Sequence, residues 1–208
     1  MKKLILILTP LFFLCSMGFA QVEEEDGFLV YGKDTVFPLS DGRILLNEKI
    51  YKENSPYLTL AYGAGSNLKQ GGIEQSLMVS YHHFIGDIGL GIGYHTSSDI
   101  KIWWRSYQKL NDLWLGAGWR YERLRYNLGI FAGPSLAYGS YIAWSDEHNE
   151  NRAYGFTNVG GVAEIQFTYR LLYDVGVGVS LYGSMNKLYT VAGAQVHLFF
   201  STAFVRNY

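Results

Sequence analysis

The feature that most constrains this chain is a period-two alternation of apolar with small or polar side chains, which begins at Tyr57. In residues 88–95, one set of alternate positions holds Ile88, Leu90, Ile92 and Tyr94, and the other holds three glycines and a histidine. The same alternation runs through residues 113–122, 159–170 and 175–182. Successive side chains of a β-strand point to opposite faces, so these segments are predicted strands. No segment after the amino terminus has the long apolar run of a membrane-spanning helix.

The two faces of these strands indicate their surroundings. One face is continuously apolar and ends in aromatic residues, whereas the other mixes glycine with charged side chains. A soluble barrel would need a polar outer surface, but here the face with small and charged side chains suits a narrow interior. The apolar face then meets lipid, with tyrosine and tryptophan at the interfaces. Backbone hydrogen bonding in lipid requires such strands to close into a ring.

The alternation predicts an all-β fold, a closed antiparallel transmembrane barrel with about eight strands in an up-and-down meander. The short connections are expected near residues 85–87, 123–125 and 171–173, and the longer or more polar loops at 67–73, 98–111, 143–155 and 185–188. Short turns belong on the periplasmic side, which places both ends of the barrel there. The expected strands are 57–66, 74–84, 88–97, 112–122, 126–142, 156–170, 174–184 and 189–204.

The amino terminus reads as an export signal. Lys2 and Lys3 precede an apolar stretch, and Gly18-Phe19-Ala20 supplies the small residues of a cleavage site, so we expect cleavage after Ala20. A retained membrane anchor is the alternative, but the apolar stretch is shorter than the about 20 residues that a spanning helix needs. The only cysteine, Cys15, lies within the signal, so the mature chain is expected to have no thiol. The expected organisation is a signal peptide (1–20), a periplasmic segment (21–56) and an outer-membrane barrel (57–208).

In this pattern, residues 57–208 resemble the small outer-membrane barrels of the OmpA/OmpX type, particularly their glycine- and tyrosine-rich versions. The aromatic last residue, Tyr208, is similar to the assembly signals of such families. The resemblance implies a bacterial outer-membrane location. A barrel of about eight strands has an interior that side chains fill. Arg120, Glu122, Glu164 and Arg170 are the candidates for ion pairs in that interior, and a proton or ion path is the alternative role for them.

Residues 21–56 differ from the rest of the chain. An acidic run at 23–26 is followed by short strand-like pieces at Phe28–Tyr31, Thr35–Phe37 and Ile44–Leu46, separated by turn residues. Three roles are open for this segment: a flexible leader, a docking element for another envelope protein, or an extra strand pair in a ten-stranded barrel.

His95 and Ser97 are the strongest candidates for catalysis, because alternate residues of a strand point to the same side. A His-x-Ser pair on a small barrel resembles the outer-membrane lipid A deacylases, and Asp99 or Asp112 could supply the acid. However, Ser98 stands where that family usually has asparagine, and His95 lies on the glycine face rather than the lipid face. We therefore expect no catalytic, cofactor or metal site.

Other residues carry weaker signals. His82 and His83 are adjacent, so they point to opposite faces and form no ligand pair on one strand. Glycines 89, 91 and 93 occupy alternate strand positions, which is not a nucleotide-binding pattern. The acidic residues of loop 146–150 could hold calcium weakly, but a solvated loop is the simpler interpretation. The aromatic residues of loop 102–107 could form a contact surface for a sugar, a lipid headgroup or a protein.

The favoured function is a non-enzymatic integral outer-membrane barrel, a structural or accessory subunit. Its expected partners are outer-membrane lipid and another envelope protein, bound through residues 21–56 or the outer loops. The alternative is a lipid A-modifying hydrolase that uses His95 and Ser97, and a pore comes third because the interior should be filled. With a formal net charge of −1, nucleic acid is not an expected partner.

Overall fold

The computed structural model describes residues 24–25, 28–31, 34–38, 44–46, 49–69, 71–99, 109–145 and 149–206. The expected signal peptide and its cleavage site lie outside these residues. The chain divides into two compact units. One unit contains Lys52–Phe204, and the other contains the chain up to Tyr51 together with Val205–Tyr208. A search of the described residues for a helix long and apolar enough to cross a membrane finds none.

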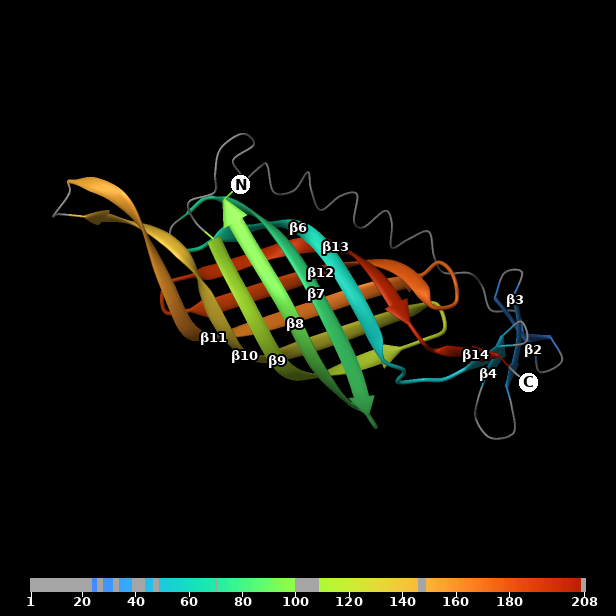
Figure 1. The fold of residues 1–208 in the computed structure, drawn as a ribbon. Helices are drawn as coiled ribbons and strands as arrows, with labels where there is room; N and C mark the ends of the chain where they lie inside the picture. Colours follow the sequence, from blue (N-terminus) through green and yellow to red (C-terminus); the bar gives the residue numbers. More distant parts are fainter. Residues whose placement is uncertain are drawn as a thin grey trace. The chain divides into compact units, whose positions relative to one another are not determined.

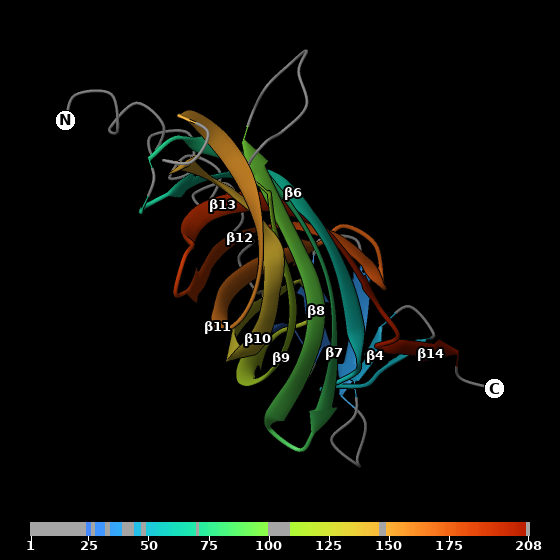
Figure 2. The ribbon, with the colours of Figure 1, turned by 60° about the vertical axis from the view of Figure 1, so that its left-hand side comes forward.

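The larger unit is a closed antiparallel barrel (Figures 1 and 2). Its strands follow one another around the wall in sequence order, and β13 pairs with β6 to close the ring through partners such as Ser201 and Tyr57. This confirms the predicted fold class with eight barrel strands. They are β6 (Tyr57–Asn67), β7 (Ile73–Ile85), β8 (Ile88–Asp99), β9 (Lys109–Glu122), β10 (Tyr126–Ser145), β11 (Glu150–Arg170), β12 (Val175–Asn186) and β13 (Thr190–Ser201).

The barrel wall separates its side chains as the alternation predicts. On β8, Ile88, Leu90 and Ile92 are 61%, 44% and 49% exposed on the outside, while the glycines between them and His95 are buried. Both faces of β7 carry apolar residues. In the structure its Met78 and Phe84 are buried in the lumen, whereas the opposite face points outward.

Short connections at 86–87, 123–125 and 171–174 define one end of the barrel, which we call the turn end, and the other end is the loop end. The start of β6 and the end of β13 lie at the turn end, because Ser201 pairs with Tyr57 and its amide donates to the carbonyl of Asp174 in the last turn. Both ends of the barrel are thus on the side with short turns, as predicted.

Several predicted strand boundaries are wrong, and the largest differences lie at two places. Most of the expected loop 143–155 is strand, because β10 and β11 continue their ladder as far as the pair Ser145 and Glu150. The resulting hairpin projects beyond the barrel wall (Figure 1). At the other end, the expected last strand 189–204 stops at Ser201. The carboxylate of Asp174 accepts hydrogen bonds from the Ser201 hydroxyl and from the amides of Ala203 and Phe204, so the chain leaves the wall there.

Pro134 lies inside β10, where the ladder to β9 is interrupted. The partners are Ala132 with Ala117 on one side and Ser135 with Trp114 on the other, so the register is the same before and after the interruption. Proline has no amide hydrogen to donate to a neighbouring strand, which accounts for the gap.

The smaller unit is built around a sheet whose strands are short. Its order is β1-β2-β3-β4-β5-β14, so the last strand of the chain joins the amino-terminal meander at its edge. The strand-like pieces expected from sequence are present, and an extra strand pair in a ten-stranded barrel is wrong because these strands belong to a separate sheet. The strands are β1 (Glu24–Glu25), β2 (Phe28–Tyr31), β3 (Asp34–Pro38), β4 (Ile44–Leu46), β5 (Lys49–Tyr51) and β14 (Phe204–Arg206).

Candidate functional site: the lumen and the loop end

A buried ion network lies at the turn end of the lumen. The carboxylate of Glu122 accepts hydrogen bonds from the guanidinium groups of both Arg120 and Arg170, and all three side chains are at most 4% exposed. The amide of Asn54 also donates to Glu122, at 3.0 Å. Three of the four predicted lumen charges are therefore brought together. The fourth, Glu164, faces the lumen beside Gln166, outside this network.

Aromatic rings fill the lumen beside the ion network, toward the turn end. The His82 ring lies 4.5 Å from the Tyr57 ring and 4.1 Å from the Phe131 ring, measured between centroids. The Arg120 guanidinium stacks over Phe84 at 4.2 Å, which links this cluster to the ion network. Glycine is needed opposite these rings: a Cβ on Gly91 would come within 2.9 Å of Trp114 and 3.1 Å of His82. The alternate glycines of β8 thus make room for aromatic side chains, rather than for a nucleotide.

The loop half of the lumen holds His95 and Ser97 in two separate polar groups. His95 lies opposite Asp112 on β9, with 3.4 Å between Nδ1 and the nearer carboxylate oxygen. That carboxylate also accepts hydrogen bonds from Ser184 at 2.5 Å and Ser135 at 3.1 Å. The Ser97 hydroxyl instead donates to Glu74 of β7. The histidine, the serine and the two acids are all at most 1% exposed.

This geometry does not assemble a nucleophile. A serine is activated by a hydrogen bond to a neighbouring base, but the hydroxyl of Ser97 is directed to Glu74. The His95 ring packs against Tyr182, with 4.8 Å between the ring centroids, and its Nε2 has no hydrogen-bond partner. Asp112 is the neighbour that the sequence suggested for His95. The contact of Ser97 with Glu74 was not predicted, although the even position of Glu74 in the span 74–84 places it on the same face as Met78.

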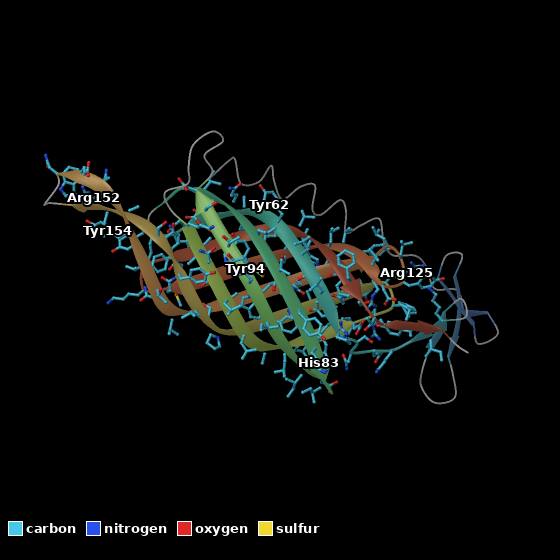
Figure 3. The ribbon with its side chains drawn as sticks, viewed as in Figure 1. Tyr62, His83, Tyr94, Arg125, Arg152 and Tyr154 are labelled. Carbon is cyan, nitrogen blue, oxygen red and sulfur yellow. The ribbon has the colours of Figure 1, made fainter. Side chains whose placement is uncertain are left out.

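The remaining candidates divide between the described and the undescribed parts of the chain. His82 is buried in the lumen and His83 is exposed on the outside (Figure 3), which confirms their opposite directions. In the described ranges, no cluster of histidine, cysteine or acidic side chains could hold a metal ion. In the predicted acidic loop, residues 146–148 lie outside the described residues, and the Glu150 carboxylate forms an ion pair with Arg152. The residues of loop 102–107 that could form a contact surface, Ile102, Trp103, Trp104 and Tyr107, also lie outside the described residues.

The projecting β10–β11 hairpin is joined to the lumen by a ladder of rings. The ring of Tyr154 lies 5.9 Å from that of Tyr141, which is 6.2 Å from Phe156, which in turn stacks 6.0 Å from Tyr189. Tyr189 is fully buried, whereas Tyr154 is 38% exposed. Figure 3 shows Tyr154 and Arg152 on the projecting hairpin and Arg125 at the opposite end of the barrel. The ladder therefore anchors a solvent-exposed ribbon to the packed interior.

Comparisons with known proteins identify the fold. No protein-family model and no curated protein sequence matches the chain. Among solved structures, Neisserial surface protein A matches with a TM-score of 0.53 and 13% identity over 70% of this chain and 95% of that one. The β-barrel domain of Pseudomonas aeruginosa OprF matches with a TM-score of 0.48 and 15% identity, over 71% of this chain and 96% of that one. Yersinia pestis Ail matches with a TM-score of 0.48 and 10% identity, over 71% and 95%.

Proposed function

The chain has the fold of the small outer-membrane barrels, and we propose that it works there without catalysis, as an anchor that docks another envelope protein. The observation that carries this proposal is the packed lumen. The ion network, the ring cluster and the two polar groups occupy its length with side chains that are nearly all buried. Such an interior favours a structural barrel over a wide channel. The parts of the chain that remain available for binding another protein are those outside the membrane.

We place the docking element in the sheet of β1–β5 and β14. This sheet has two edge strands, β1 and β14. An edge strand offers unpaired backbone groups to a strand of another chain. The edge strand β1 consists of Glu24 and Glu25, within the acidic run, so the surface favours a partner with basic side chains. The strands β5 and β14 connect in the chain to the two ends of the barrel, which lie at the turn end. In outer-membrane barrels the short turns face the periplasm. The proposed partner is therefore a periplasmic or membrane-attached envelope protein.

A deletion of residues 21–50 tests the docking role. The barrel strands begin at Tyr57, so the deleted protein should still insert and migrate differently with and without boiling. Proteins that co-purify with the full-length chain in mild detergent should be lost. The substitutions Glu24→Lys and Glu25→Lys should weaken the binding of the same partner while leaving the sheet intact. If the partner survives the deletion but is lost when Trp103 and Trp104 are replaced by serine, docking occurs at the outer loops and the proposal is wrong.

The second candidate, a lipid A hydrolase, draws its support from the contact between His95 and Asp112. The test is mass spectrometry of lipid A from cells with the wild type, with His95→Ala, with Ser97→Ala, and without the protein. We expect the same acylation pattern in all four, since Ser97 is bonded to Glu74 rather than to His95. An acyl chain that is removed only in the presence of the wild-type protein would establish the hydrolase and overturn the anchor.

A further inference from the structure

The outward face of the barrel changes abruptly from apolar to polar on the wall formed by β7 to β11. Strand pairing aligns outward side chains into rows across this wall. Apart from one tyrosine, the first of three successive rows is apolar, and the next two are largely polar. The first row is Val79, Tyr94, Leu113, Leu136 and Val159; the second is Leu77, Thr96, Asn111, Tyr138 and Thr157; the third is Gln75, Ser98, Lys109, Ser140 and Gly155.

The polar side chains of these rows are ordered by hydrogen bonds. The Asn111 side-chain oxygen accepts from the Tyr94 hydroxyl at 2.8 Å and from the Thr96 hydroxyl at 3.0 Å. Its amide nitrogen donates to the carbonyl of Tyr138 at 3.2 Å. Asn111 is only 6% exposed, although its position points outward. Lys109 is exposed beside this cluster and pairs across the strands with Ser98 and Ser140.

A shallow, open depression adjoins this polar cluster. It has a volume of about 400 Å³ and is lined by Tyr138, Gly139, Gly155, Phe156 and Thr157. A Cβ added to Gly155 would meet only the carbonyl oxygen of Gly139, at 3.9 Å, so there is room for a larger group above this glycine. The depression is thus bordered by the ring of Tyr138 and by Thr157, and it has free space above Gly155.

The next two strands around the wall, β12 and β13, have a different surface. Toward the loop end, the outward positions of β12 and β13 hold Gly183, Met185, Ala192 and Ala194. Met185 is 65% exposed. These four residues are apolar, and their outward neighbours at the ends of β13 and β6 are Thr190 and Ser66. The hydrogen-bonded cluster around Asn111, by contrast, is formed by residues of β8, β9 and β10.

We propose that the wall of β8 to β11 binds the phosphorylated saccharide headgroup of an outer-leaflet glycolipid. The apolar surface of this wall is interrupted by the cluster, so we infer that a lipid headgroup rather than an acyl chain covers it. An aromatic ring beside hydroxyl and amide groups suits a sugar, which has both apolar and hydroxylated faces. Lys109 lies two strands from Gly155, roughly 10 Å across the sheet, and supplies a positive charge for a phosphate.

Filling the depression tests the site. Gly155→Leu places a side chain in it, and Gly183→Leu is the matched control, since a Cβ at either position meets only a carbonyl oxygen, at 3.9 Å. Lys109→Gln removes the charge, with Lys187→Gln as its control. Each folded variant, checked by heat-modifiable migration, is reconstituted in phosphatidylcholine nanodiscs with lipid A or with phosphatidylglycerol. Bound lipid is then counted by native mass spectrometry.

We expect the wild type and both controls to retain lipid A in preference to phosphatidylglycerol. Gly155→Leu and Lys109→Gln should each lower lipid A retention. For Lys109→Gln, which removes one charged hydrogen bond, the expected decrease is roughly tenfold. Three results would overturn the proposal: equal retention of lipid A by Gly155→Leu and the wild type, no effect of Lys109→Gln, or equal retention of the two lipids by the wild type. This outcome is independent of the docking role, which is read from a protein partner.

Discussion

Glu122 bridges two buried arginines at the turn end of the lumen, and Glu122→Gln removes its negative charge while preserving the size of the side chain. Arg120 and Arg170 both donate to this carboxylate, and Arg170 is held in place by the carbonyls of Arg123 and Leu124 at 3.0 and 3.3 Å. Removing one partner of a buried ion pair leaves an uncompensated charge, which costs about 3–5 kcal/mol. We expect the free energy of unfolding to fall by that amount.

The measurement is urea unfolding of the barrel in lipid vesicles, followed by tryptophan fluorescence and by heat-modifiable migration. The matched control is Glu150→Gln, which breaks the exposed pair of Glu150 with Arg152, where the two side chains are 57% and 44% exposed. An exposed pair contributes at most about 1 kcal/mol, so the control should unfold nearly as the wild type does. If Glu122→Gln stays within about 1 kcal/mol of the wild type, the network does not stabilise the barrel.

Three further predictions concern the packing of the barrel and its surroundings. Gly91→Val forces a side chain against Trp114 and His82 and should destabilise by about 1–3 kcal/mol in the same assay, with Gly183→Val near neutral. Leu115→Arg places a charge on a side chain that is 62% exposed to lipid, at a cost of about 2–4 kcal/mol if it lies near the bilayer midplane; unfolding in vesicles that matches the wild type would contradict a lipid-facing position. Planar-bilayer recordings of the purified barrel should show no stable step of porin size, and reproducible large steps would contradict the packed lumen.

Much of the barrel is readable from sequence because its information is local. The direction of each side chain follows from its odd or even position in a strand, so the lipid face of β8 and the lumen position of Arg120 could be assigned without knowing any partner strand. The short turns and the number of barrel strands follow from where the alternation is interrupted. The opposite directions of His82 and His83 required only that they are adjacent in a strand.

What the tertiary structure decided is which residues of different strands meet, and where pairing stops. The carboxylate of Glu122 on β9 reaches Arg170 on β11, and His95 reaches Asp112 while Ser97 reaches Glu74, through the stagger of neighbouring strands. Register between strands depends on contacts distant in sequence, so alternation within one strand carries no record of it. The length of the β10–β11 hairpin and the end of β13 are set in the same way, by ladder partners and by Asp174, and these lie outside the pattern of the strand itself.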